Sequence, residues 1–396
     1  MKVKLGDYIE QIRGVSYQPT DLMETLSENS IALLRANNIQ EDGLNFEDIV
    51  YVSRDRVSKN QIIRSGDILV CTSSGSKNLV GKAAQSKENI GMTFGAFCKV
   101  VRTDKIYPRF LGHFFCSPLY RKEISYLSTG ANINNIRNEH IDGLEIVLPS
   151  IEEQKKIAEI LDKASNLISL RKKQTEKMDL LIKARFIEMF GDPESNPKKW
   201  PVKKIADVIE ESPQNGLYKP ASDYTNDGSG IPILRIDAFY DGKVTNFRYL
   251  KRLNCTEKEL ELYQLHEGDI VINRVNSIEY LGKCALIKGL LENTVFESNM
   301  MRFKVKDNIL NPFFVTKLLC TKHLYNQIIS HAKKAVNQAS INQKDVQDFE
   351  IYVPPKDLQD AFAEFVEYIE AQELELKNGL EKLELTYKAL MQQYFN

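Results

Sequence analysis

Residues 151–190 read IEEQKKIAEILDKASNLISLRKKQTEKMDLLIKARFIEMF and contain neither proline nor glycine. Apolar side chains recur there in steps of three and four residues, the spacing of one helix face. The pattern predicts one continuous helix of about 60 Å at 1.5 Å per residue. Gly191 and Pro193 then supply a C-terminal stop. The seam positions are Ile157, Leu161, Ala164, Ile168, Thr175, Met178, Ile182 and Met189, with Arg171 and Arg185 interrupting it.

A helix with so narrow a stripe favours a partner helix over a globular core. Residues 356–394 offer that partner, because apolar side chains recur there at heptad spacing in two series, one from Phe362 to Leu390 and one from Val366 to Tyr394. Glu373 is the charged exception in the second series. Residues 151–190 carry nine Lys/Arg against seven Asp/Glu, whereas residues 356–394 carry four against nine. This charge difference favours pairing of the two helices with each other. The alternative is two unrelated surface helices.

The composition is that of an ordinary globular chain. Its 396 residues, 42% hydrophobic and 27% charged, are enough for two to four domains. The opening MKVKLGDYIEQI lacks an apolar signal core, and no run approaches the length of a membrane span. Six scattered cysteines without a CxxC motif and five unclustered histidines argue against a zinc site. We therefore expect a cytoplasmic protein in a reducing compartment.

The sequence contains an internal repeat, because several short segments of its first half recur in its second half. IALLR at 31–35 returns as IPILR at 231–235, and GDILV at 66–70 returns as GDIVI at 268–272. Gly-Lys follows both of the Gly-Asp-Ile segments, at 81–82 and 282–283, and the offset between these copies stays within 200–202. Several anchors in the same order with nearly constant spacing indicate a duplication.

We predict an α+β fold with two similar mixed α/β domains, residues 1–150 and 192–355. Each is followed by a long helix, residues 151–191 and 356–396. The two helices are expected to separate the domains and to pack as an antiparallel coiled coil about a pseudo-two-fold axis. Such an arrangement suits a rod-like ligand with two separated patches. DNA, whose half-sites are spaced by helical turns, is the candidate.

Two motifs resemble catalytic sequences without completing them. Gly75 to Ala83 resembles a phosphate loop, but it has one residue too many between its glycines and an alanine where Ser or Thr would meet magnesium. Asn311-Pro312-Phe313-Phe314 resembles the tetrapeptide of amino-methyltransferases but lacks its second proline. A hairpin turn and a helix start account for them. No metal site and no catalytic set recurs in both units.

Amide-rich and basic loops do recur, and such side chains suit hydrogen bonding to phosphates and base edges. The loops are residues 128–137 with 333–343, residues 72–82 with 274–283, and residues 216–230. For the first pair, the alternative is a capped turn before the last strand. The predicted DNA-binding residues are Lys77, Asn78, Lys82, Asn132, Asn134, Asn135, Arg137, Tyr218, Lys219, Tyr224, Arg235, Arg274, Asn276, Lys283, Asn337, Gln338, Ser340 and Asn342.

Over essentially its whole length the chain resembles the specificity subunit of type I restriction-modification systems. The marks are IPILR, Gly-Asp-Ile with its following Gly-Lys, and Asn-Ile-Asn-Asn-Ile at 132–136. The most specific is Leu148-Pro-Ser-Ile-Glu-Glu-Gln154, a proline-ended strand that leads into a helix. In the second unit the corresponding sequence is Val353-Pro-Pro-Lys-Asp-Leu-Gln359, which keeps little of this motif. The resemblance of the second unit to the family therefore rests on its predicted architecture more than on its sequence.

The resemblance implies a non-catalytic subunit whose two target recognition domains each read one half of an asymmetric, bipartite DNA sequence. The helix pair would set the spacing and dock two modification subunits, which bind S-adenosylmethionine. Two restriction subunits, which use ATP and magnesium, would join them, so no cofactor is expected in this chain. Two alternatives stay open: a fused DNA methyltransferase or nuclease with its own recognition domain, and a coiled-coil scaffold that reads no sequence.

Overall fold

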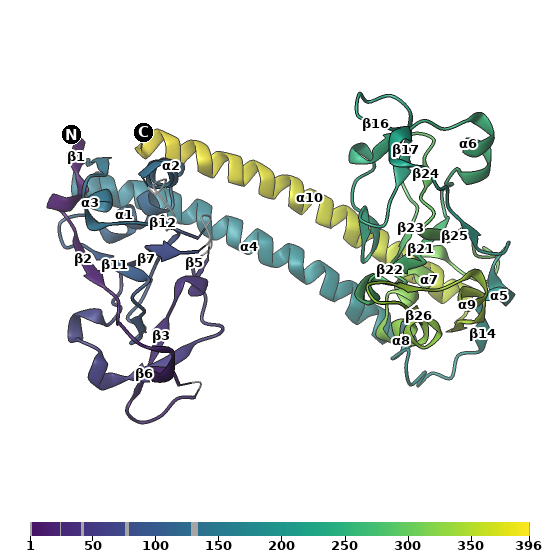
Figure 1. The fold of residues 1–396 in the computed structure, drawn as a ribbon, viewed down its shortest axis with the longest axis horizontal. Coiled ribbons are helices and arrows are strands. Elements are labelled where there is room, and N and C mark those ends of the chain that lie inside the picture. The colour runs from purple at the N-terminus through teal and green to yellow at the C-terminus, as the bar shows by residue number, and fades with distance from the viewer. Residues whose placement is uncertain (1, 24, 41–42, 76–78, 128–133, 396) are drawn as a thin grey trace. The chain divides into compact units, whose positions relative to one another are not determined.

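The computed structural model describes residues 2–23, 25–40, 43–75, 79–127 and 134–395. The chain divides into two compact units (Figure 1). Unit 1 comprises residues 1–176 and 374–396, and unit 2 comprises residues 177–373. The long helices α4 (Ile151–Phe190) and α10 (Lys356–Phe395) each contribute residues to both units. None of the helices in the described part of the chain is long and apolar enough to cross a membrane.

Unit 1 is built on a four-stranded antiparallel sheet and a smaller three-stranded sheet. The first has the order β2 (Glu10–Arg13), β11 (Cys98–Arg102), β7 (Ile68–Cys71), β9 (Ala83–Gln85). The second has the order β10 (Thr93–Phe94), β3 (Ser30–Leu34), β6 (Val50–Ser53). Strand β7 is buried on both faces, since alternate side chains enter two different apolar cores.

Unit 2 repeats this strand order. Its larger sheet runs β15 (Gln214–Asn215), β25 (Met300–Phe303), β21 (Ile270–Asn273), β23 (Cys284–Leu286), extended by β19 (Gly242–Val244) and β18 (Phe239–Tyr240). Its smaller sheet runs β16 (Tyr224–Thr225), β20 (Lys251–Leu253), β17 (Ile231–Leu234), β24 (Val295–Phe296). The parallel pair recurs at the same place, as β3 with β10 and as β17 with β24.

Each unit closes in the same way. Its first strand pairs antiparallel with its last: β1 (Lys2–Lys4) with β13 (Glu145–Val147), and β14 (Val202–Lys204) with β28 (Glu350–Tyr352). Three helices precede the last strand, α1 (Pro108–Phe115), α2 (Pro118–Leu127) and α3 (Asn138–Asp142) in unit 1. Their counterparts are α7 (Pro312–Leu319), α8 (Lys322–His331) and α9 (Gln343–Asp348). Proline opens α1 and α7 because its fixed φ suits a first helical turn.

The long helices pack antiparallel, which confirms the predicted fold class. In unit 1, Ile157 and Leu161 of α4 share a core with Met391 near the end of α10. In unit 2, Phe186 near the end of α4 shares a core with Phe362 near the start of α10. Early residues of one helix therefore meet late residues of the other. The predicted seam positions of both helices are all buried or half-buried.

An aromatic side chain anchors each globular part to the end of a long helix. The Phe395 ring of α10 lies 5.1 Å from the Phe110 ring of α1 in unit 1. In unit 2 the Phe190 ring of α4 lies 4.6 Å from the Phe314 ring of α7. Phe110 and Phe314 follow their helix-opening prolines at the same spacing, so the two contacts are equivalent.

The glutamine of the Glu-Glu-Gln motif fastens each long helix to its unit. The Oε1 atom of Gln154 accepts the backbone N–H of Tyr107 at 2.8 Å, and its Nε2 donates to the Pro149 carbonyl at 2.9 Å. Gln359 accepts the backbone N–H of Asn311 at 2.9 Å and donates to the Pro354 carbonyl at 2.8 Å. Both side chains are buried, and this explains why the glutamine persists where the rest of the second copy differs.

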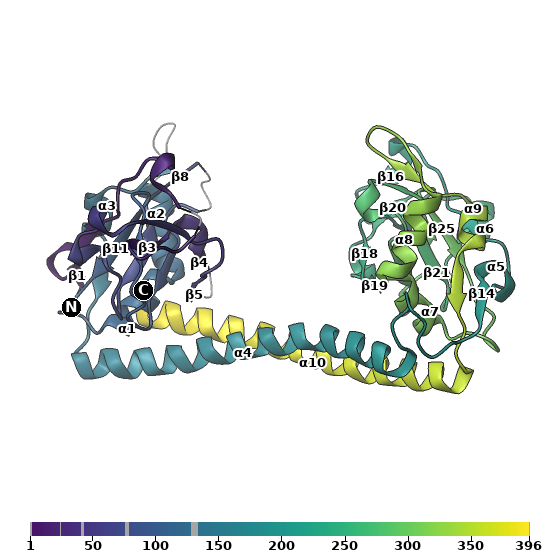
Figure 2. The ribbon, with the colours of Figure 1, turned by 90° about the horizontal axis from the view of Figure 1, so that it is seen from below.

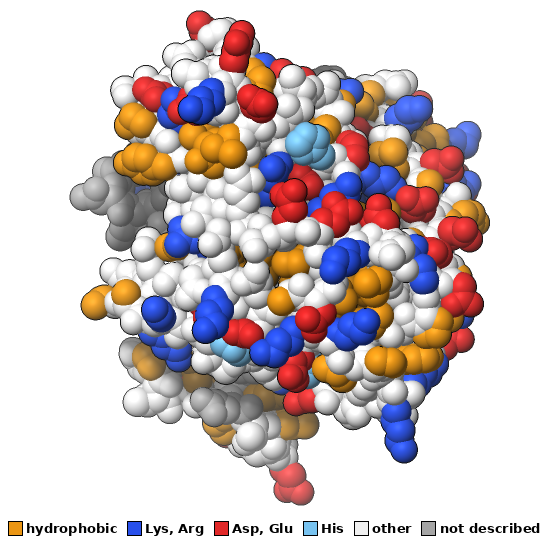
Figure 3. All heavy atoms as spheres, turned by 90° about the vertical axis from the view of Figure 1, so that its right-hand side faces the viewer, with side chains coloured by type: hydrophobic (Ala, Val, Ile, Leu, Met, Phe, Trp, Pro, Cys, Tyr) orange, Lys and Arg blue, Asp and Glu red, His pale blue; other side chains and the backbone are white. Residues whose placement is uncertain are grey.

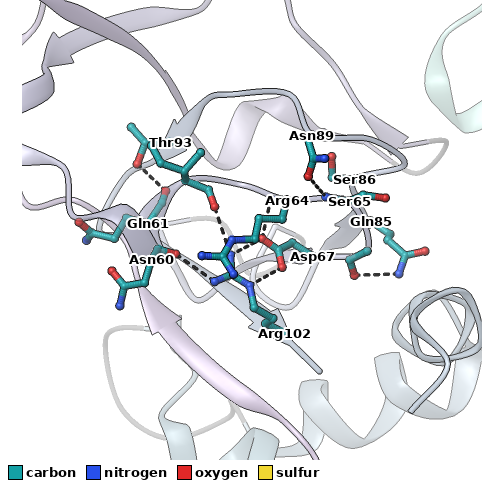
Figure 4. A network of polar contacts seen from close by, with 12 residues as sticks. Asn60, Gln61, Arg64, Ser65, Asp67, Gln85, Ser86, Asn89, Thr93 and Arg102 are labelled. Atoms are coloured by element: carbon teal, nitrogen blue, oxygen red, sulfur yellow. Dashed lines mark hydrogen bonds and ion pairs between the residues drawn. The ribbon is translucent and has the colours of Figure 1, made fainter. Parts of the chain in front are cut away.

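The repeated Gly-Asp-Ile text is also structural. Gly66 and Gly268 have φ of +88° and +87°, values that glycine adopts without a steric penalty. The aspartate that follows Gly66, Asp67, accepts the backbone N–H of Arg64 at 2.8 Å. It also accepts two hydrogen bonds from Arg102, at 2.7 and 2.6 Å (Figure 4). The motif therefore orders the turn before the central strand.

Candidate nucleic-acid interface

In unit 1, two of the predicted loops meet as a short ribbon. Strand β8 (Ser73–Ser74) pairs antiparallel with β12 (Asn134–Asn135), and the backbone N–H of Ile136 donates to the Thr72 carbonyl at 2.8 Å. Figure 2 shows β8 at the end of unit 1 opposite helix α4. The structure thus brings together loops that are about sixty residues apart in sequence.

The predicted residues of unit 1 lie on or beside this ribbon. Asn135 is exposed on β12, and Asn134 is the β12 residue opposite Ser74. Arg137 is exposed and forms an ion pair with Glu139 at 3.5 Å. Lys82 is half-buried in the turn after β8. The candidates Lys77, Asn78 and Asn132 fall outside the described residues.

Unit 2 contains the equivalent ribbon with one more strand. Strand β27 (Ala339–Ser340) pairs antiparallel with both β22 (Val275–Asn276) and β26 (Lys333–Lys334). The connecting turn is closed by a hydrogen bond of 2.7 Å from the Ala335 N–H to the Gln338 carbonyl. Asn337, Gln338 and the two lysines of β26 are exposed, and Ser340 and Asn276 are half-buried. Lys333 and Lys334 belong to the predicted loop 333–343 but were not among the predicted DNA-binding residues, although two adjacent lysines in an amide-rich loop were a usable signal.

Two predicted residues of this region have structural partners. The Oδ1 atom of Asn342 accepts the backbone N–H groups of Lys344 and Asp345, at 2.8 and 3.1 Å, and so caps helix α9. Asn342 therefore fits the alternative interpretation of this loop, a capped turn before the last strand. Arg274 is half-buried, and its guanidinium donates to the Ser298 carbonyl at 3.2 Å.

The third predicted loop, residues 216–230, contains side chains that are exposed and side chains that contact other residues of unit 2. Tyr218 is 77% exposed and remains available to a ligand. Lys219 forms an ion pair with Glu259 at 2.9 Å, and this hydrogen bond raises the pKa of the Lys219 ammonium. Arg235 lies over the Tyr224 ring at 5.9 Å and beside the Glu297 carboxylate at 3.6 Å. The charges of Lys219 and Arg235 are therefore balanced within unit 2.

Lys283 lies among aromatic rings. Its Nζ is 3.9 Å from the ring centre of Tyr240, 5.0 Å from that of Phe239 and 5.5 Å from that of Tyr280. Burial lowers the pKa of this ammonium. The preceding Gly282 has φ of +74°, and a Cβ there would lie 2.4 Å from Ile328 of α8. The repeated Gly-Lys is thus a tight turn against a helix rather than a phosphate loop.

Unit 1 has a pocket of about 400 Å³ beside its ribbon. Arg35 and Asn37, which follow β3, line one part of it, and Ser73 of β8 lines another. Tyr17 and Phe97 add aromatic surface, and Phe97 is 64% exposed. Burial raises the pKa of the Tyr17 hydroxyl, an effect that the nearby Arg35 charge opposes. A cavity with a cation, an amide and aromatic walls suits a planar, polar ligand.

Charged side chains of both signs are intermixed on the face shown in Figure 3, with no large area of one sign. Among the described residues, no group of three or more His, Cys, Asp or Glu side chains is placed to hold a metal ion. The arrangement can present hydrogen-bonding groups from local loops to a polyanion.

Comparison with known proteins gives consistent results. A family model described as "Type I restriction modification DNA specificity domain" matches residues 1–179 and 197–385. The chain is 32% identical over 403 residues to the EcoKI specificity subunit of Escherichia coli K12, covering 97% of this chain and 86% of that protein. It is 29% identical, with the same coverage, to the StySPI specificity subunit of Salmonella potsdam. The fold is similar to the S subunit from M. genitalium, with a TM-score of 0.61 at 14% identity over 100% of this chain and 96% of that one.

Proposed function

Since the chain belongs to the family of type I restriction-modification DNA specificity subunits, of which it is a non-catalytic member, we propose that each unit reads one half of an asymmetric, interrupted DNA target. The observation that carries this proposal is the duplicated ribbon. Loops that differ in sequence, β8 with β12 and β22 with β26 and β27, form equivalent ribbons on equivalent strand frameworks. Equivalent position with unlike side chains lets one chain recognise two different half-sites.

The candidate contacts divide by chemistry. Exposed amides such as Asn135, Asn337 and Gln338 can each make two hydrogen bonds to an adenine edge, worth about 1–3 kcal/mol of discrimination per base. The exposed Lys333 and Lys334 suit phosphates, which supply affinity but carry no sequence information. We therefore assign discrimination to the amides and salt-dependent affinity to the lysines.

The domain organisation follows from this assignment. Residues 1–150 and 192–355 would be the target recognition domains, and residues 151–191 and 356–396 would be the helices that set the gap between half-sites. Both paths between the units are helical, because α4 and α10 each continue past the unit boundary. A helix transmits a change of length at 1.5 Å per residue, so the helix pair can serve as a ruler.

The remaining chemistry is assigned to partners. The chain would dock two modification subunits that bind S-adenosylmethionine, and two restriction subunits that use ATP and magnesium, in the cytoplasm where its DNA substrate lies. This assignment agrees with the incomplete phosphate-loop and methyltransferase motifs of the sequence.

The test is to map the methylated motif of cells that express the chain with its modification subunits. Replacing Asn337 and Gln338 together by alanine is expected to relax one half of the motif and to leave the other half and the gap unchanged. Gln392→Ala, which removes an exposed amide from α10, is the matched control and should leave the whole motif unchanged. An unaltered motif in the double variant would reject the reading role of the ribbon.

A further inference from the structure

The pocket of unit 1 and the equivalent place in unit 2 differ at one backbone position. Arg35 follows β3, and Arg235 follows β17, at the end of the repeated IALLR and IPILR texts. The carbonyl before each arginine accepts a backbone N–H, from Gly95 at 2.9 Å in unit 1 and from Glu297 at 3.0 Å in unit 2. Gly95 and Glu297 are therefore structural counterparts, each adjacent to an equivalent arginine.

In unit 2, two carboxylates lie beside the arginine and balance its charge. Its Oε2 atom lies 3.6 Å from the Nε of Arg235, and Asp237 lies 3.9 Å from the same nitrogen. The other carboxylate oxygen of Glu297 accepts the backbone N–H of Ile236 at 2.6 Å. The Tyr224 ring lies against the guanidinium. Arg235 is therefore held by its own unit.

In unit 1 the same guanidinium lacks that partner. Arg35 donates from one terminal nitrogen to the Asp48 carbonyl at 2.9 Å. The Nε atoms of Arg35 and Arg235 are both buried without a hydrogen-bond acceptor among the described residues, but the glycine at position 95 brings no carboxylate near Arg35. Among the described residues, Arg35 therefore has no ion-pair partner of the kind that Arg235 has, and it lines an open pocket, which indicates that a ligand supplies the acceptor.

The residues around Arg35 indicate which kind of hydrogen-bond acceptor the ligand would present to its guanidinium. An arginine fork matches either the O6 and N7 atoms of guanine or two phosphate oxygens. Beside Arg35 the pocket has the exposed Phe97 ring, the Tyr17 ring and the hydroxyl of Ser73. Aromatic rings give a phosphate no favourable contact, whereas apolar side chains such as Phe do contact base edges in the major groove, so the guanine edge fits this place better.

We propose that Arg35 determines specificity in unit 1 by recognising a guanine in its half of the DNA target, a role that Glu297 denies to Arg235 in unit 2. The inference rests on the proposed function, because it requires unit 1 to contact DNA. It deepens that function by naming the residue and the base.

The experiment selects binding sequences from a random duplex library, using the full chain assembled with its modification subunits. The wild type, Arg35→Ala and Arg35→Lys are compared with Arg54→Ala, which removes an exposed arginine of the same unit away from the pocket. In both Arg35 variants, the preference for guanine at one position is expected to fall about tenfold to a hundredfold. The other half-site and the Arg54→Ala motif should be unchanged. Replacing that guanine by 7-deazaguanine should weaken the wild type and leave Arg35→Ala unaffected.

Arg35→Lys separates base reading from phosphate contact, because lysine keeps the charge but loses the planar fork. If Arg35→Lys keeps the motif, or if Arg35→Ala weakens all sequences equally and lowers the salt slope by about one, the residue contacts a phosphate and the proposal is overturned. A wild type that selects no motif would instead overturn the proposed function itself.

Discussion

Helix α1 of unit 1 and helix α7 of unit 2 meet the long helices through different chemistry. In unit 1, Arg109 donates from Nε to the Asp162 carboxylate of α4 at 3.1 Å, and His113 bonds the same carboxylate at 2.8 Å. His113 also bonds the Tyr387 hydroxyl of α10 at 3.2 Å. Here a half-buried polar network joins one short helix to both long ones.

In unit 2 the same positions carry other side chains. Phe313 stands where unit 1 has Arg109, and Lys317 stands where it has His113. Glu367 replaces Asp162 and pairs with Lys288 at 2.8 Å, in a half-exposed place. The aromatic anchors Phe314 with Phe190, by contrast, have direct counterparts in unit 1. The apolar core and the backbone hydrogen bonds therefore define the fold that the two units share, whereas the polar pairs around them differ.

The largest effect is expected where the two units agree. Phe190→Ala should lower the free energy of unfolding of unit 2 by about 3–5 kcal/mol, because Phe190 packs against Phe186, Phe314 and Phe362. Phe395→Ala should cost less, since a site at the end of a chain can collapse around the deletion. Urea unfolding measures both. Fluorescence of the single Trp200, which donates to the Phe190 carbonyl at 2.9 Å, reports unit 2, and circular dichroism reports the whole chain.

Leu385→Ala is the matched control on α10, because this leucine is 67% exposed and its loss should change stability by less than about 0.5 kcal/mol. A larger loss of stability for Phe395→Ala than for Phe190→Ala would contradict the predicted order of the two anchors.

A smaller effect on stability is expected at Asp67 and Asp269, the equivalent aspartates of the two Gly-Asp-Ile motifs. Asp67→Asn breaks a buried ion pair with Arg102 and should cost about 3 kcal/mol. Asp269→Asn should cost about 1 kcal/mol. Asp269 lies 3.5 Å from Arg302, and burial raises the pKa of its carboxyl despite the hydrogen bond from the His266 N–H. Thermal unfolding of the two variants makes the comparison, and equal losses would contradict it.

The effect expected at Asp162 is smaller than that at Asp67, and it depends on pH. Burial alone would raise the pKa of this carboxyl, but the hydrogen bonds from His113 and Arg109 outweigh burial and hold the pKa at about 2, below the ordinary value of 3.8. The stabilisation is therefore complete above pH 3.8 and is lost as the pH falls towards 2. Asp162→Asn should cost about 1–2 kcal/mol at pH 7.

Urea unfolding of the wild type and Asp162→Asn at pH 7 and pH 3 measures this dependence, and the difference between the two proteins should shrink at the lower pH. Glu367→Gln, the unit 2 counterpart, is exposed and should show a small difference at both values. A difference for Asp162→Asn that does not change with pH would contradict the assigned network.

The fold could be predicted largely because its signals are local and repeated. The apolar spacing from Ile157 to Met189 defined a helix that the structure places at Ile151–Phe190, and the doubled text defined two like units. The helix start at Pro312 followed from the fixed φ of proline. Each of these depends on residues close together in sequence.

The site could be predicted only in part, because its contacts join distant residues. The loops that form the ribbons were identified, but strands of two residues such as β8 and β12 are too short to show an alternating pattern. Arg235 meets Glu297 from about sixty positions away, and nothing in the local text distinguishes it from Arg35. The sequence likewise could not reveal that Lys219 is paired with Glu259 or that Asn342 caps a helix.

The most direct test exchanges residues 1–150 for the corresponding segment of another member of the family and maps the methylated motif in genomic DNA. The account predicts that one half of the motif changes to that of the donor, while the other half and the gap between them stay as they were. A hybrid that alters both halves, or neither, would contradict the claim that each unit reads its own half of the target.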